Sequence, residues 1–227
     1  MFTNREHAGR LLGLRLAHLQ ERRGAEVLVL GLARGGVVVA AEIAEALAAP
    51  LDVLVVRKLG APARPELAIG AVTDGEHPQR VLNERLIARL GVRQEFLQKE
   101  IERQLQEVRR RQSLYRGGRP APEPADRVVI IVDDGIATGA TVRAGIQSLR
   151  QASARRVVLA VPVAPPETAR ALGAEVDELA CLETPDVFPA VGSFYDDFRQ
   201  TTDEEVIALL AKRRSGGTVE REKIDRD

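Results

Sequence analysis

Five stretches of the chain are almost continuously apolar, and they lie at 27–32, 51–56, 127–132, 156–163 and, more weakly, 175–182. A strand covered on both faces is apolar throughout, whereas a strand with one face in water alternates. Helical patterns come before and between these stretches, at 5–20, 37–49, 141–151 and 166–172. This order predicts an α/β fold: a doubly wound, mainly parallel sheet with helices on both faces.

The segment between the second and third stretches departs from this alternation. It contains a proline-rich turn, APARPE, a possible strand, LAIGAV, and a long helical pattern that ends near Gly117. We interpret residues 73–120 as an inserted helical arm on a single domain that spans 1–227. Residues 182–200 would form a small hood, and the polar tail at 215–227 is expected to fray.

Charged residues balance, with 33 basic and 33 acidic side chains, so the overall charge does not favour nucleic acid or an anionic membrane as a partner. The one cysteine, Cys181, cannot form an internal disulfide, and the first ten residues lack the apolar core of a signal peptide. No apolar run approaches the roughly 18–20 residues that span a bilayer. We therefore expect a cytoplasmic protein with no membrane partner.

The stretch VVIIVDDGIATGAT, residues 128–141, joins a buried strand to a helix through two carboxylates and a loop of small residues. In open parallel sheets, ligands bind beyond the carboxyl ends of the strands. The loop GIATGAT places backbone amides and hydroxyls at a helix start, which suits a phosphate. Asp133 and Asp134 would repel a phosphate, so they would face sugar hydroxyls, Mg²⁺ or both. A sugar phosphate offers both kinds of group.

Two other phosphate-binding motifs fit this stretch less well. A P-loop contains Gly-Lys-Ser/Thr, and Ala140 stands where that lysine would be. A dinucleotide fingerprint has its acidic residue about 20 positions after the glycines, whereas here the acidic residues come first. A surface turn capped by an aspartate explains a lone Asp-Gly, but it does not explain the whole string.

The same stretch closely resembles the 5-phosphoribosyl-1-pyrophosphate (PRPP) binding motif of the type I phosphoribosyltransferases. That motif consists of four or five apolar residues, two acidic residues and a small Thr-Gly loop. The resemblance implies that Asp133 and Asp134 bind the ribose hydroxyls, with Mg²⁺ held directly or through ribose and water. It places the 5-phosphate of PRPP on Ala137, Thr138, Gly139, Ala140 and Thr141.

The activity that this resemblance implies is transfer of the phosphoribosyl group of PRPP to a nitrogen nucleophile, with release of pyrophosphate. The transition state has oxocarbenium character, so catalysis depends on positioning and on neutralising the departing pyrophosphate rather than on a covalent nucleophile. The three histidines show no metal-ligand spacing. We expect a Mg²⁺-dependent transferase of nucleotide salvage that acts as a homodimer.

The pyrophosphate would bind at the ends of the first two strands. The sequence LARGGV offers Arg34 with the amides of Gly35 and Gly36 at a helix start, which is similar to the pyrophosphate loop of the family. Several members hold this loop with a non-proline cis peptide bond, and the resemblance places that bond within residues 33–35. Lys58 follows the second strand and is one of only four lysines, so we expect a compact charge to be needed there.

Many members of the family carry a mobile loop after the second strand, and APARPELAIGAV stands at that place here. Glu66 would be the carboxylate of such a lid, whereas a static turn fixed by Pro62 and Pro65 is the alternative. The long helical arm that follows departs from the family pattern. It would act either as a dimer interface or as a cover, and the sequence leaves both open.

Four of the seven aromatic residues fall within 188–198, and bases stack on aromatic faces. The segment DVFPAVGSFYDDFRQ resembles the base pocket of purine-salvage enzymes, so Phe188 and Tyr195 are candidates for base binding; an ordinary core cluster is the alternative. Two departures weaken a purine assignment. Ala137 stands where the 6-oxopurine enzymes carry an aspartate, and ETPD lacks their lysine. The acceptor base therefore stays open.

A second class of function also stays open. Some proteins of this fold bind PRPP as a signal and regulate nucleic acid. The arm is rich in arginine, at Arg103, Arg109, Arg110, Arg111, Arg116 and Arg119. A solvated helix with Glu107 and Arg111 paired at i,i+4 explains most of these residues equally well. Nucleic-acid binding that weakens steeply with salt and responds to PRPP would favour regulation.

Overall fold

A computed structural model describes residues 1–20, 26–73 and 80–212. Its centre is a five-stranded sheet in which all neighbouring strands are parallel, in the order β2-β1-β6-β7-β8. The strands are β1 (Val27–Leu32), β2 (Leu51–Leu54), β6 (Val128–Val132), β7 (Arg156–Val163) and β8 (Glu178–Glu183). β1 and β6 are buried at every position, which explains why their sequences do not alternate. The predicted parallel sheet is confirmed.

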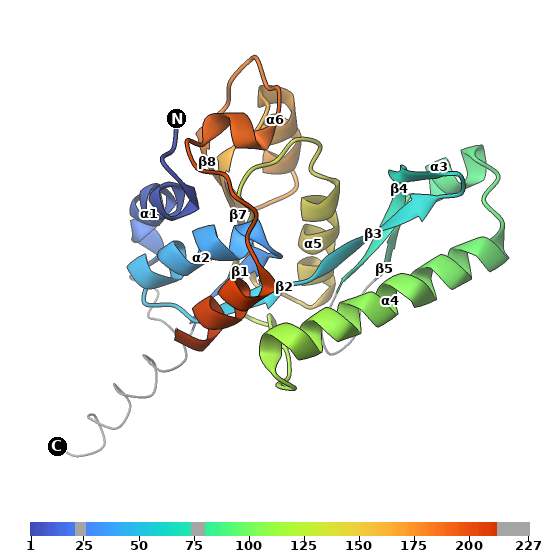
Figure 1. The fold of residues 1–227 in the computed structure, drawn as a ribbon, viewed down its shortest axis with the longest axis horizontal. Helices are drawn as coiled ribbons and strands as arrows, with labels where there is room; N and C mark the ends of the chain where they lie inside the picture. Colours follow the sequence, from blue (N-terminus) through green and yellow to red (C-terminus); the bar gives the residue numbers. More distant parts are fainter. Residues whose placement is uncertain (21–25, 74–79, 213–227) are drawn as a thin grey trace.

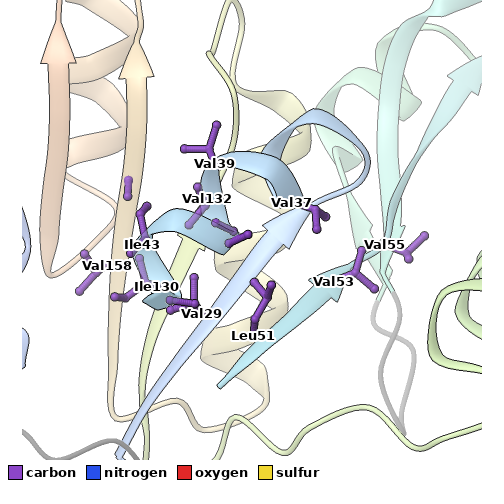
Figure 2. Close-up of a cluster of buried hydrophobic side chains, with 14 of the residues drawn as sticks. Val29, Val37, Val39, Ile43, Leu51, Val53, Val55, Ile130, Val132 and Val158 are labelled. Carbon is purple, nitrogen blue, oxygen red and sulfur yellow. The ribbon is translucent and has the colours of Figure 1, made fainter. Parts of the chain in front are cut away.

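Helices cover both faces of this sheet (Figure 1). α1 (Arg5–Arg15), with the short η1 (Ala17–Leu19) after it, and α2 (Gly35–Ala46) lie on one face, while α5 (Ala140–Gln151) and α6 (Pro166–Gly173) lie on the other. Ile43 of α2 lies beside the strand side chains Ile130 and Val158, and Val37, Val39 and Val29 belong to the same buried cluster (Figure 2). Full burial of each such side chain contributes about 1.5–3 kcal/mol. The doubly wound arrangement is therefore also confirmed.

The second apolar stretch does not form one strand. β2 ends at Leu54, and after Val55 the chain enters β3 (Val56–Ala61), which belongs to a separate antiparallel sheet of order β3-β4-β5. β4 (Arg64–Thr73) and β5 (Arg80–Leu82) complete that second sheet. Because the residues stay apolar across the change of sheet, their pattern does not reveal where one strand ends and the next begins.

The second sheet and two helices form an arm that projects from the main sheet (Figure 1). α3 (Glu84–Arg89) lies at the far end, and the 23-residue α4 (Gln94–Arg116) runs back along β3 and β4. A chain of polar side chains docks α4 on β3: Arg57 Nε donates to Gln104 Oε1 at 3.1 Å, and Gln104 Nε2 donates to Glu100 Oε1 at 2.9 Å. The segment predicted as a helical arm is thus part strand and part helix.

Arg116 ties the C-terminal end of α4 to the main sheet. Its side chain is 3% exposed, its Nε donates to Asp52 Oδ1 at 2.9 Å, and its Nη2 donates to the carbonyl oxygen of Val53 at 2.6 Å. Both acceptors belong to β2. This contact therefore fixes the position at which the arm returns to the sheet.

The segment predicted as a hood, 182–200, contains the end of β8, a loop and the 3-10 helix η3 (Val191–Phe194). A parallel bridge between Phe2 and Tyr195 joins it to the first residues of the chain. Residues 203–212 are helical. The predicted polar tail at 215–227 lies outside the described residues. Within the described ranges, no helix is both long enough and apolar enough to cross a membrane.

Replacing Arg116 with alanine should lower the free energy of unfolding by about 3 kcal/mol, because Asp52 then loses the partner that compensates its desolvation. Arg155→Ala is the matched control, since Arg155 pairs with Glu26 where both side chains are about half exposed, and such surface pairs are worth at most about 1 kcal/mol. Urea unfolding followed by circular dichroism measures both. Equal losses in the two variants would show that Arg116 does not anchor the arm.

Candidate functional site

Two loops meet at the carboxyl end of the parallel sheet. β1 and β6 are neighbours, with Gly31 opposite Val132. The loop after β1 carries Arg34, and the segment after β6 carries Asp133 and Asp134. Residues that are about 100 positions apart in the sequence therefore lie side by side, at the edge where parallel sheets bind ligands.

Two glycines allow these loops to touch. A Cβ on Gly35 would lie 1.9 Å from Asp134 Oδ2, and a Cβ on Gly36 would lie 2.6 Å from the carbonyl oxygen of the last β6 residue. A side chain at Gly36 would push the two loops apart, and one at Gly35 would displace the carboxylate of Asp134. The peptide bond between residues 33 and 34 is cis, which is where the resemblance placed such a bond.

The loop after the two carboxylates leads directly into α5. Gly139 has φ 75°, a conformation that glycine adopts without steric cost, and α5 begins at the next residue. In the described part of the chain, no acceptor takes a hydrogen bond from the amides of residues 137–141. Free amides at a helix start, with the helix dipole behind them, favour an anion. One turn thus holds the five residues expected to bind phosphate: Ala137, Thr138, Gly139, Ala140 and Thr141.

A pocket of about 530 Å³ opens beside the two carboxylates, which is within the range of small-molecule sites. Its lining combines Asp133 and Asp134 with arginines from three other parts of the chain, namely Arg5, Arg34 and Arg111. Opposite charges therefore share one concave surface. Such a surface suits a ligand that has both hydroxyl groups and anionic groups.

Arg5 holds Asp134 in place, although its sequence context gave no sign of this. Arg5 Nε donates to Asp134 Oδ2 at 2.7 Å, and Nη1 donates to the carbonyl oxygen of Arg199 at 2.8 Å. The guanidinium carbon lies 3.9 Å from the centre of the Phe198 ring, a cation–π contact. Because the Arg5 side chain is only 9% exposed, the ion pair is largely desolvated. Arg5 stands alone at the start of α1, so no motif could identify it.

The paired carboxylates are electrostatically unfavourable when no ligand is bound. Burial raises the pKa of Asp133 well above its ordinary value, and the nearby charge of Asp134 raises it further. The amide of Asp134 donates to Asp133 Oδ1 at 3.0 Å, and this hydrogen bond lowers the pKa of Asp133. A bound cation or hydroxyl donors would relieve the remaining repulsion.

The same two carboxylates fit Mg²⁺ as hard oxygen donors. Over the described ranges, no group of three or more His, Cys, Asp or Glu side chains is placed to hold a metal ion. Mg²⁺ commonly keeps several waters and is bound by one or two carboxylates together with substrate oxygens. Asp133 and Asp134 would therefore hold the ion jointly with a ligand rather than alone.

Arg34 lies near a third carboxylate, which is not among the residues that line the pocket. Its Nη1 lies 3.9 Å from Asp203 Oδ1, and the hydroxyl of Tyr115 donates to the same oxygen at 2.6 Å. Burial raises the pKa of Tyr115 to about 12, and the hydrogen bond to Asp203 contributes in the same direction. The hydroxyl is therefore protonated at neutral pH and keeps Asp203 beside Arg34. Neither Asp203 nor Tyr115 was singled out from the sequence.

The two residues predicted after the second strand lie outside the pocket. Lys58 on β3 and Glu66 on β4 are exposed, and neither is among the residues that line it. Both belong to the β3–β4 hairpin of the arm. They would reach a ligand only if that hairpin moved over the pocket.

The two aromatic residues predicted to bind a base are engaged with other protein groups. Tyr195 is 6% exposed, and its hydroxyl donates to the carbonyl oxygen of Asp134 at 2.6 Å. The ring of Phe188 lies against that of Phe194, with centroids 5.1 Å apart. The aromatic ring in the pocket lining is instead Phe198.

Asp133→Asn should stabilise the ligand-free protein. Since the folded-state pKa of Asp133 is raised, its carboxylate costs stability once the pH exceeds the unfolded-state value, and asparagine removes that cost while still accepting from the Asp134 amide. The variant should melt higher at pH 8 by about 2–4 °C for each kcal/mol gained, with little difference near pH 4. Calorimetry in Mg²⁺-free buffer measures this, and an equal or lower melting temperature at pH 8 would contradict it.

Comparison with known proteins agrees with this geometry. The family described as "Phosphoribosyl transferase domain" matches residues 80–199. Two proteins of Mycobacterium tuberculosis, from strains CDC 1551 / Oshkosh and H37Rv, are each 48% identical over 210 residues, and both are named provisionally as phosphoribosyl transferases. The match covers 92% of this chain and 46% of each relative, so the chain spans about half the length of the curated relatives it matches.

A solved structure is similar over nearly the whole chain. TT1426 from Thermus thermophilus is 45% identical, covers 93% of this chain and 98% of its own, and superposes with a TM-score of 0.81. The family match includes β6, the two carboxylates and the loop that leads into α5. By the family match, which takes in more than half of its residues, the chain belongs to the phosphoribosyl transferase domain family.

Proposed function

We propose that this protein is a Mg²⁺-dependent phosphoribosyltransferase that transfers the 5-phosphoribosyl group of PRPP to a nitrogen nucleophile. The observation that carries the proposal is the meeting of Asp133 and Asp134 with the free amides of residues 137–141 at one strand end. That arrangement pairs acceptors for ribose hydroxyls with donors for a 5-phosphate. The main sheet, the arm and the segment 198–201 act together in this proposal, because the pocket takes side chains from all three.

In this reaction the bond between C1 and the pyrophosphate oxygen breaks while a bond between C1 and nitrogen forms. The pyrophosphate leaves with the electron pair of the broken bond, and the proton of the nucleophile is released to water. Asp133 and Asp134 hold the ribose so that C1 faces the pocket, which converts binding into orientation. Arg34 and the amides of the glycine loop stabilise the charge that develops on the leaving group. Mg²⁺, when bound, neutralises part of the same charge.

The acceptor that we propose is a nucleobase, with a purine favoured by the resemblance of residues 186–200 to purine-salvage enzymes. Phe188 and Tyr195 would shape the base pocket from behind, since Tyr195 supports Asp134 through its hydroxyl. The polar side chains Gln200 and Thr201 line the pocket and would contact polar edges of the base.

Contacts of the arm arginines favour this proposal over nucleic-acid regulation. Arg103 pairs with Glu100, and Arg110 and Arg111 both pair with Glu107. Arg116 is buried against Asp52, and Arg119 Nε donates to the carbonyl oxygen of Arg116. Most of the basic residues that suggested nucleic acid are therefore paired with groups of the protein itself.

Replacing both Asp133 and Asp134 by asparagine should weaken PRPP binding at least about tenfold, because hydrogen bonds to charged groups are worth roughly 1.5–3 kcal/mol each. Titration calorimetry with PRPP and Mg²⁺ measures the affinity. Asp126→Asn is the matched control: Asp126 lies at the opposite end of β6, so its loss should not change binding. Unchanged affinity in the double variant would remove these carboxylates from the site.

A panel of nucleobases, assayed for pyrophosphate release from PRPP, tests the function directly. We expect base-dependent release with one base or a small group of related bases, and purines ahead of pyrimidines. Release that no base stimulates, together with salt-sensitive nucleic-acid binding that responds to PRPP, would instead support the regulatory alternative.

A further inference from the structure

The inserted arm reaches the pocket through one side chain. α4 carries Arg111 in its last two turns, and Arg111 lines the same pocket as Arg34, Asp133 and Asp134. The arm's helix runs back from α3 toward the main sheet, so this part of it lies close to the helical residues 203–212 (Figure 1). The long helix of the arm thus contributes a cation to the candidate site.

Arg111 is held in a way that leaves most of its donors available. Its Nε donates to Glu107 Oε1 at 2.7 Å, one turn earlier on the helix. In the described ranges, no acceptor takes a hydrogen bond from its two terminal nitrogens. The side chain is 25% exposed and so remains accessible from the pocket. Glu107 fixes the guanidinium through Nε and leaves the two terminal nitrogens, which can bind a phosphate together, without a partner of this kind.

Pairing with Glu107 is not enough to explain Arg111, because another residue already performs that role. Arg110 donates to both oxygens of Glu107, through Nε at 2.8 Å and Nη2 at 3.0 Å. Arg110 is 59% exposed and does not line the pocket. The carboxylate is therefore compensated without Arg111, which crowds a second positive charge next to it.

Arg34 and Arg111 share the lining of the pocket. Arg111 and Arg34 also both act on the buried hydroxyl of Tyr115, so the two guanidinium groups both lie near it. Arg5, the remaining arginine of the pocket, is committed to Asp134. Among the described residues that line the pocket, Arg34 and Arg111 are therefore the two cations that are not paired with Asp134.

We propose that Arg111 binds the pyrophosphate group of PRPP jointly with Arg34, so that the arm supplies part of the leaving-group site within the same chain. Asp203 and Tyr115 are positioning residues: the Tyr115 hydroxyl fixes Asp203, and Asp203 keeps Arg34 on the side of Arg111. The 3.9 Å separation between Arg34 and Asp203 is long enough for Arg34 to exchange this partner for an anion. Lys58, exposed on the hairpin, is then not required for pyrophosphate to bind.

This inference rests on the proposed function, and its test separates the two. Titration calorimetry with Mg²⁺ measures three ligands on each protein: PRPP, pyrophosphate and ribose 5-phosphate, which lacks the leaving group. Arg111→Gln should weaken PRPP and pyrophosphate binding at least about tenfold, as expected for a lost hydrogen bond between charged groups, and should leave ribose 5-phosphate binding unchanged. Arg111→Lys keeps the positive charge but loses the paired terminal nitrogens, so its affinity for pyrophosphate should lie between those of the natural protein and Arg111→Gln.

Arg110→Gln is the control, since it removes a neighbouring arginine with the same partner from outside the pocket. Its affinities for all three ligands should equal those of the natural protein. Equal affinity for pyrophosphate in Arg111→Gln and Arg110→Gln would overturn the assignment of Arg111, as would a loss of ribose 5-phosphate binding as large as that of pyrophosphate. Failure of the unaltered protein to bind PRPP would instead overturn the proposed function and this inference with it.

Discussion

The pairing of β1 with β6 is the constraint on which the candidate site depends. It sets Gly31 beside Val132, so the loops that follow β1 and β6 leave the sheet next to each other at its carboxyl edge. The loops can touch only because Gly36 has no side chain where the backbone at the end of β6 lies, and the Asp134 carboxylate fits beside Gly35 for the same reason. The strands must be apolar because both of their faces are covered. The polar groups of the site must therefore follow the strand ends, and the strand register brings these ends together.

The site brings together elements whose charges are unfavourable separately. Two carboxylates share a mostly buried position, and three arginines converge on the same cavity. Positive and negative charges partly compensate each other: Arg5 pairs with Asp134, and Arg34 lies near Asp203. Unfavourable charge pairs of this kind lower the stability of the ligand-free protein. A ligand of complementary charge restores that stability when it binds.

Much of the fold could be read from the sequence because its signals are local, and continuous apolar runs identified the buried strands. The change of sheet after β2 could not be read, since apolar character reports burial and not which neighbour covers the residue. Arg34 and the two aspartates sit next to strand ends, so topology alone places them together. Arg5 and Arg111 arrive from helices far away in the sequence, and nothing in their immediate context distinguishes them from the other arginines. Their roles depend on tertiary contacts such as the Phe198 ring and the buried end of α4.

The order of the strands in the sheet also determines whether a fragment of this protein can fold. The part of the chain that matches the family, 80–199, contains β6, β7 and β8 but not β1 or β2. In that fragment β6, an entirely apolar strand from the middle of the sheet, would become an edge with unpaired amides and carbonyls. We expect such a fragment to aggregate. For this chain, a sequence-match boundary is therefore not a folding boundary.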